Sequence, residues 1–220
     1  MHTRPMALPS ADPTYNQVAG DRSLDRIGAL SDGLFAIAMT IIVLEITVPA
    51  LEAHTDAALL AAIGQLGPRF LTYFLSFLTL GIFWNAQHAQ LNYVARADRH
   101  FAWLQLVYLS IVALMPFSTS LLAEFIDLRV AFLVYWLNLY LLGVGLYAAW
   151  WYANRADLLT ADASPGVRYA FRRRIVVYQV AYGVGAVVAI LVGTLPALAW
   201  VLLTQLNSAI ATRLPWVSRV

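Results

Sequence analysis

The sequence contains no cysteine and no lysine, and charged residues of either sign are scarce. The absence of cysteine excludes disulfide frameworks, cysteine-ligated metals and thiol chemistry. Charged residues make up 12% of the 220 residues, whereas a soluble domain usually carries about 25%. Hydrophobic residues make up 61%, and the mean hydropathy is +0.69. So few charges cannot cover a surface in water, which makes soluble enzymes, nucleic-acid-binding proteins and disordered chains poor interpretations.

Long apolar runs are abundant instead, and each is close to the roughly 20 residues that cross a hydrocarbon core. The expected spans cover about residues 29–49, 70–92, 101–123, 130–152, 175–193 and 195–212. The stretch from Asp56 to Leu66 is expected to form a short helix at the membrane interface. We therefore expect an all-α integral membrane protein with six transmembrane helices in one domain over residues 25–214. A flexible N-terminal tail is expected at 1–24 and a short C-terminal tail at 215–220.

All 14 basic residues are arginine, and their positions predict the topology. Only Arg69 and Arg129 fall on one side of the predicted spans, and the other twelve fall on the opposite side. The positive-inside rule then places both termini in the cytoplasm of a multi-pass protein of the inner (plasma) membrane. The run at residues 172–174 is also compatible with a lipid-binding or nucleic-acid patch, but charge that sets topology is the commoner explanation.

The first span carries a narrow stripe of mainly aliphatic residues. At about 100° per residue, the stripe contains Arg26, Leu30, Gly33, Ile37, Ile41 and Leu44. Thr40 flanks it, and Glu45 lies near its outer end, where a carboxylate would attract cations. Simple helix packing is the usual explanation for such a stripe, although the small Gly33 would allow helices to approach closely. The pattern alone therefore leaves both packing and a pore open.

Polar residues gather at the cytoplasmic ends of the first two spans. Asp32 is expected to face the protein's own bundle, because it points away from the stripe, with Ser31 to one side. The second span ends with polar and aromatic residues that share much of one face: Trp84, Gln87, His88 and Asn92. A network joining the two helices follows, and it either fixes their packing or serves gating or pH sensing. A metal site is not expected, because a single histidine lies within a span.

These residues resemble a known family. Arg26, Leu-Ser-Asp-Gly at 30–33, Ala36-Ile37 and Thr40 are similar to the Arg-x3-Phe-Ser-Asp signature of prokaryotic transmembrane protein 175 type potassium channels. Further similarities are Trp84 with His88, Asp98, and Pro116-Phe117. Leu30 stands where the family has phenylalanine.

The resemblance implies a homotetramer in which the first helix of each subunit lines a central pore for potassium ions within membrane lipid. Ile37 would form the hydrophobic constriction, with rings of Ile41 and Leu44 further outward, and Thr40 would contribute to cation preference. The supporting network would contain Arg26, Ser31, Asp32, Trp84, His88 and Asn92. No cofactor, resident metal, nucleic acid or enzymatic activity is implied.

The chemistry of such a pore would be unusual, because the chain lacks a Thr-Val-Gly-Tyr-Gly loop of carbonyl ligands. An isoleucine ring would gate by dewetting and modestly favour potassium, which gives up water more readily than sodium. The alternatives are a secondary transporter or a proton-leak pathway of the inner membrane. An intramembrane enzyme is disfavoured, since no nucleophile–base pair or metal cluster is found at membrane depth.

Overall fold

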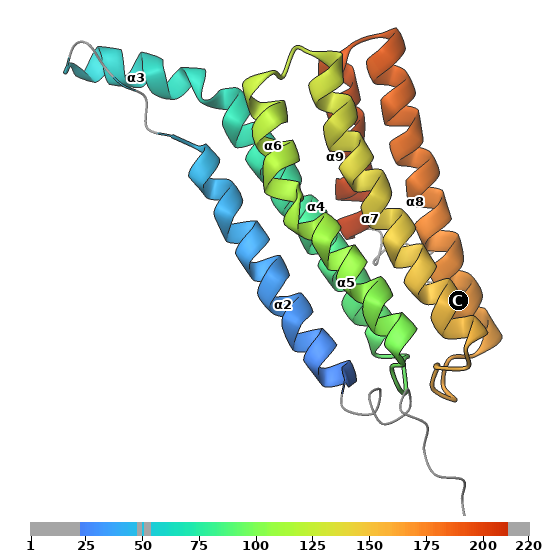
Figure 1. Cartoon of the computed structure of the whole chain (residues 1–220). Helices are drawn as coiled ribbons and strands as arrows, with labels where there is room; N and C mark the ends of the chain where they lie inside the picture. The colour runs from blue at the N-terminus through green and yellow to red at the C-terminus, as the bar shows by residue number, and fades with distance from the viewer. Residues whose placement is uncertain (1–22, 48–49, 51–53, 211–220) are drawn as a thin grey trace, which may run out of the picture.

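The computed structural model describes residues 23–47, 50 and 54–210. Most of the expected N-terminal tail, the last residues of the sixth span and the whole C-terminal tail lie outside these ranges. The described part is a bundle of helices (Figure 1). In chain order the helices are α2 (Ser23–Ile41), the 3-10 helix η1 (Ile42–Glu45), α3 (Asp56–Gln65), α4 (Gly67–Leu91), α5 (Arg99–Ala113), α6 (Met115–Glu124), α7 (Arg129–Arg155), α8 (Pro165–Leu191) and α9 (Thr194–Ile210).

Proline and capping residues explain most of the helix boundaries. The expected third span is divided into α5 and α6, because Pro116 has no N–H to continue the helix and stands at the start of α6. The short helix expected from Asp56 is confirmed as α3, which begins at the N-cap Thr55. Helices α8 and α9 are joined by a turn at Gly193, whose φ of 140° favours glycine.

Helix α8 begins ten residues before the expected fifth span. Ser164 caps its N-terminus by accepting a hydrogen bond from the N–H of Val167 (3.3 Å), and Pro165 occupies the first turn, where no donor is needed. The arginine run at 172–174 therefore lies inside a helix rather than in a loop. Hydropathy marked only the apolar part of this helix, because arginine lowers the average without breaking a helix.

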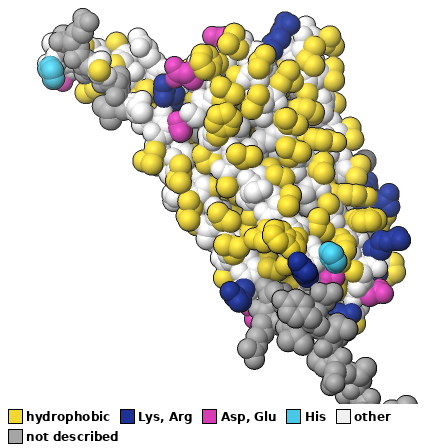
Figure 2. Space-filling view, viewed as in Figure 1, with side chains coloured by type: hydrophobic (Ala, Val, Ile, Leu, Met, Phe, Trp, Pro, Cys, Tyr) yellow, Lys and Arg dark blue, Asp and Glu magenta, His cyan; other side chains and the backbone are white. Residues whose placement is uncertain are grey.

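Several of the helices are able to cross a membrane. Among the described residues, four segments are long and apolar enough: Leu24–Glu45, Arg99–Glu124, α7 and α8. Helices α3 and α4 satisfy the same test only together, across a bend of 45°, and α9 is apolar but spans 17 residues. On the face that Figure 2 shows, hydrophobic side chains cover most of the length of the bundle, and charged ones lie mainly towards its two ends. The protein is a multi-pass membrane protein, and six spans per subunit stays a prediction.

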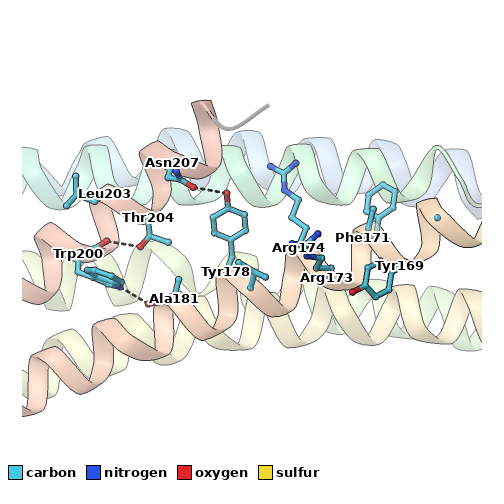
Figure 3. Close-up of a pocket in the computed structure, with 13 residues that line it drawn as sticks. Tyr169, Phe171, Arg173, Arg174, Tyr178, Ala181, Trp200, Leu203, Thr204 and Asn207 are labelled. Carbon is cyan, nitrogen blue, oxygen red and sulfur yellow. Dashed lines mark hydrogen bonds between the residues drawn. The ribbon is translucent and has the colours of Figure 1, made fainter. Parts of the chain in front are cut away.

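A groove opens between α8 and α9 on the side of the bundle away from α2 (Figures 1 and 3). Helix α2 makes its contacts with α4, α5 and α6, whereas α8 packs on α7 and α9. The groove and the exposed face of α2 are therefore separate surfaces.

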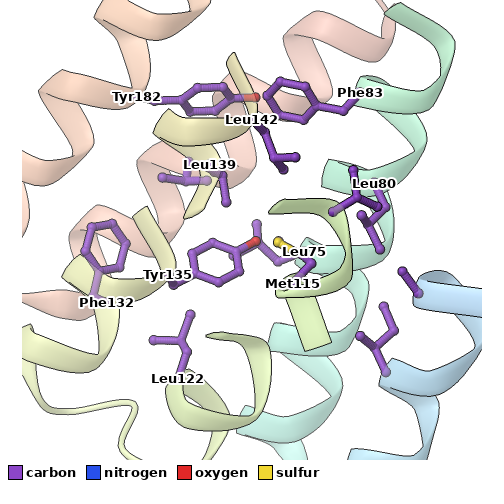
Figure 4. Close-up of a cluster of buried hydrophobic side chains, with 14 of the residues drawn as sticks. Leu75, Leu80, Phe83, Met115, Leu122, Phe132, Tyr135, Leu139, Leu142 and Tyr182 are labelled. Carbon is purple, nitrogen blue, oxygen red and sulfur yellow. The ribbon is translucent and has the colours of Figure 1, made fainter. Parts of the chain in front are cut away.

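The main core lies between α4, α6 and α7, with further side chains from α2, α5, α8 and α9. Large side chains meet there (Figure 4), among them Leu80, Met115, Phe132, Tyr135 and Leu139, all fully buried. Helix α2 contributes Phe35, Ala38 and Ile42 to this core and packs at one edge of the bundle on α4, α5 and α6.

Candidate functional site

Helix α2 has one face packed on its own bundle and one face exposed. The buried face repeats at helical spacing and consists of Ile27, Ser31, Phe35, Ala38 and Ile42. Phe35, 1% exposed, packs against Tyr108 of α5 with ring centroids 6.2 Å apart. This packing fixes the rotation of α2 about its axis and so determines which residues face outward.

The stripe expected from the sequence is the outward face. Ile37 is 55% exposed, Ile41 42% and Leu44 72%, although all three are large and apolar. Leu30 and Gly33 are exposed on the same side, and no atom lies within 4 Å of a Cβ built on Gly33. A single chain therefore presents an apolar surface on α2 that lipid or another copy must cover.

Thr40 is also exposed, and its hydroxyl donates to its own helix, to the carbonyls of Ala36 (2.9 Å) and Ile37 (3.0 Å). The hydroxyl proton is therefore already engaged in hydrogen bonds within α2. The exposed oxygen can still accept a hydrogen bond, so Thr40 offers an acceptor beside the stripe.

Ser31, rather than Asp32, points into the bundle. Ser31 is 2% exposed and donates to Oε1 of Gln87 on α4, and Nε2 of Gln87 donates to Oε1 of Gln105 on α5 (2.7 Å). Asp32 is directed towards the polar end of the second span, as expected, but it lies exposed at the edge of the bundle rather than inside it. On a helical wheel Ser31 lies about 120° to one side of the stripe and Asp32 about 140° to the other, and the bundle packs on the Ser31 side. Gln105 was not singled out by the sequence, since a lone glutamine in a span carries no motif.

Asp32 lies at the exposed edge of α2, where its carboxylate accepts a hydrogen bond from the indole Nε1 of Trp84 (2.7 Å). The ring of Trp84 stacks on His88, one turn further along α4, with centroids 5.8 Å apart. His88 is exposed in the single chain, and so are Arg26 and Asn92. Among the described residues, neither of the last two has a side-chain hydrogen bond, so the structure joins only part of the expected network.

Glu45 turns towards the bundle rather than towards the stripe. Its carboxylate accepts a hydrogen bond from the hydroxyl of Ser120 on α6 (2.7 Å), and its carbonyl accepts one from Arg69 (2.9 Å). Arg69 also forms an ion pair with Glu124 (2.7 Å). The expected position at the pore mouth assumed an α-helical period. The 3-10 turn of η1 has three residues per turn, which places Glu45 in line with the buried Ile42.

A second buried polar network joins four helices near the middle of the bundle. Gln205 on α9 donates to Thr79 on α4 (2.6 Å), and the Thr79 hydroxyl lies 3.1 Å from that of Tyr135 on α7. Thr119 on α6 donates to Ser76 on α4 (2.7 Å). These groups are packed among core side chains, so the network fixes interhelical contacts.

Comparison with known proteins shows to which family the chain belongs. Residues 26–116 match the family model described as endosomal/lysosomal potassium channel TMEM175. A potassium channel of Streptomyces collinus is 35% identical over 173 residues, which cover 74% of this chain and 83% of that protein. The chain belongs to the TMEM175 family. The resemblance to this family is thereby confirmed, and the protein is a channel rather than an enzyme.

Two further similarities support membership in the TMEM175 family. A potassium channel of Chamaesiphon minutus is 36% identical over 140 residues, 62% of this chain and 69% of that protein. A crystal structure of a lysosomal potassium-selective channel TMEM175 homolog from Chamaesiphon minutus gives a TM-score of 0.75 at 26% identity. It covers 87% of this chain and 98% of its own. The family model begins at Arg26 and therefore includes the whole exposed stripe of α2.

We expect Asp32→Ala and Trp84→Phe to lower the stability of the assembled TMEM175 protein by a similar amount, about 1 kcal/mol, because each removes one end of the same hydrogen bond. The double variant should be little worse than either single variant. Thermal unfolding of the purified protein in detergent measures all three. If Asp32→Ala assembles with unchanged stability and alters only ion selectivity, Asp32 lines the conduction path instead.

We expect Glu45→Gln to behave like the parent and Glu45→Ala to lose about 1 kcal/mol of stability, since glutamine still offers an oxygen to Ser120. Current should be recorded at low and high ionic strength. If both variants lose conductance in dilute salt but not in concentrated salt, the charge of Glu45 attracts cations, because salt screens such an effect.

Proposed function

We propose that this chain is a potassium-preferring cation channel: a homotetramer, six spans per subunit, in which four copies of α2 line one central pore. The observation that carries the proposal is the apolar stripe of α2, which faces away from its own bundle within the segment that matches the family model. Relatives named as potassium channels support the choice of ion.

The narrowest ring would be formed by Ile37, with Ile41 and Leu44 further outward. Their tips offer no oxygen ligands, so ions pass hydrated or after losing part of their water. A dry constriction raises the free energy of every ion, and the penalty is smaller for potassium than for sodium, because potassium binds water less tightly. Thr40, exposed next to the ring, offers an oxygen that offsets part of this penalty.

The distribution of arginine supports an orientation with both termini in the cytoplasm. The arginines of α8 and of the loop between α4 and α5 collect at the end of the bundle where α2 begins. The Ser31–Gln87–Gln105 network lies at this end and would hold α2 against the rest of its subunit. In a bacterial cell this orientation corresponds to the inner membrane.

The absence of cysteine makes a direct test possible. Ile37→Cys is combined with a matched control, Ile190→Cys on α8, where the native side chain is 52% exposed but lies far from α2. The proteins are reconstituted in liposomes, and potassium flux is measured with and without a membrane-impermeant thiol reagent. We expect the reagent to block flux only in Ile37→Cys, and oxidation to cross-link subunits only there.

The oligomeric state and the flux distinguish the competing functions. A tetramer that carries passive potassium flux supports the proposal. A monomer refutes it, because one helix per subunit cannot enclose a pore. Flux only under exchange conditions indicates a secondary transporter, and proton flux without potassium flux indicates a proton-leak pathway.

A further inference from the structure

The groove between α8 and α9 combines a basic end with an apolar wall. Its volume is about 750 Å³, within the range of about 300–1,000 Å³ that is common for ligand sites. Figure 3 shows Trp200, Leu203 and Ala181 towards one end of the groove, then Tyr178 and Asn207, then the two arginines, with Phe171 and Tyr169 beyond them. From Trp200 to the arginines the lining changes from apolar to basic, which matches an amphiphile and not a uniformly polar ligand.

The basic end lies at the depth of lipid headgroups. Arg174 is 17 residues before the end of α8 at Leu191, which corresponds to about 26 Å along the helix. The hydrocarbon core is about 30 Å thick. With the C-terminal end of α8 at the opposite interface, Arg174 therefore falls close to the boundary between acyl chains and headgroups. The wall beyond it, including Val177 and Leu203, lies beside acyl chains.

The two arginines in the groove are not neutralised by carboxylates. No Asp or Glu is among the described residues that line the groove, and within the described chain neither Arg173 nor Arg174 forms an ion pair. Arg174 lies over the ring of Tyr178 at 5.9 Å and donates one long bond, 3.4 Å, to the carbonyl of Ser208. These contacts orient its guanidinium but leave several N–H donors for an anion.

We propose that the groove binds an anionic phospholipid, with its phosphate on Arg173 and Arg174 and one acyl chain along Val177, Ala181 and Leu203. Charge complementarity and depth favour this occupant. Guanidinium groups form forked hydrogen bonds with phosphate, and basic pockets between helices at the cytoplasmic face suit anionic headgroups. The proposal needs neither a pore nor a tetramer, so it does not depend on the proposed channel function.

The test compares Arg173→Gln/Arg174→Gln with Arg172→Gln, a control from the same run that does not line the groove. Binding of phosphatidylglycerol and phosphatidylcholine to the full chain is titrated by native mass spectrometry. We expect the parent and Arg172→Gln to prefer phosphatidylglycerol, and the double variant to bind it roughly 25-fold more weakly. A second variant, Ala181→Leu, keeps both arginines and fills the apolar wall, and it should also weaken binding.

Three results would overturn the proposal. The first is equal affinity of the parent for the two lipids, which would mean nonspecific annular contact. The second is an equal loss in Arg172→Gln, which would mean that the whole run acts only as diffuse positive charge. The third is phosphatidylglycerol binding that emerges only after residues 211–220, which follow α9, have been deleted. In that case this segment of the chain is the occupant.

Discussion

Ile37→Asn should open a leak and reduce the preference for potassium over sodium. The isoleucine is large and 55% exposed on the outward stripe of α2, where four tips would exclude water. Asparagine is smaller and offers an amide that binds water, so the constriction becomes wet. Each reduction of about 1.4 kcal/mol in the dewetting barrier raises the rate of passage about tenfold. Reversal potentials and currents in planar bilayers measure both effects, and Ile37→Ala should shift them in the same direction.

Two controls separate the constriction from general packing. Ile190→Ala removes the same atoms from a side chain of similar exposure on α8 and should leave conduction unchanged. Phe35→Ala removes a buried side chain on the opposite face of α2, and it should cost about 3–5 kcal/mol of stability without a specific change in selectivity. If Ile37→Asn conducts and selects like the parent, the constriction lies elsewhere.

Gln87→Leu should destabilise the subunit by about 1–3 kcal/mol and release α2 from the bundle, because it leaves two buried partners without a hydrogen bond. Gln87 is 1% exposed, accepts from Ser31 and donates to Gln105. Thermal unfolding in detergent, followed by size-exclusion chromatography, measures both the loss of stability and the loss of assembly.

Gln90 on the same helix provides a matched comparison. It is 4% exposed, but its Nε2 has no hydrogen-bond partner among the described residues. Gln90→Leu should therefore be neutral or stabilising, since it removes an unpaired amide. Adding Gln105→Leu to Gln87→Leu should recover part of the lost stability. Equal losses in Gln87→Leu and Gln90→Leu would show that polarity itself, rather than the Ser31 network, matters at this depth.

Hydropathy and helical period were sufficient to predict the helical class and the outward stripe. Both depend on local sequence, and a period of 3.6 residues placed Ile37, Ile41 and Leu44 together before any packing was known. The family signature is equally local, since Arg26, Ser31 and Asp32 occupy less than two turns.

Contacts between helices could not be predicted in the same way. A helical wheel shows that Ser31 and Asp32 flank the stripe on opposite sides, but it does not show on which side the bundle packs. The position of Glu45 depended on a 3-10 turn, which tightens the helix without any proline or glycine in η1 to signal it. The partners Gln87 and Gln105 are 18 residues apart and meet only in the folded bundle, where α4 and α5 both pack on α2.

The network of Thr79, Tyr135 and Gln205 also has a consequence for biosynthesis. Thr79 and Gln205, which share a hydrogen bond, are 126 positions apart in the sequence. This bond therefore forms only after α9 has left the ribosome and entered the membrane. Until then, the hydroxyl groups of Thr79 and Tyr135 pair only with each other and with groups of α4, and no side chain of α9 covers them. An unfinished or truncated chain therefore exposes a polar patch that the complete protein hides.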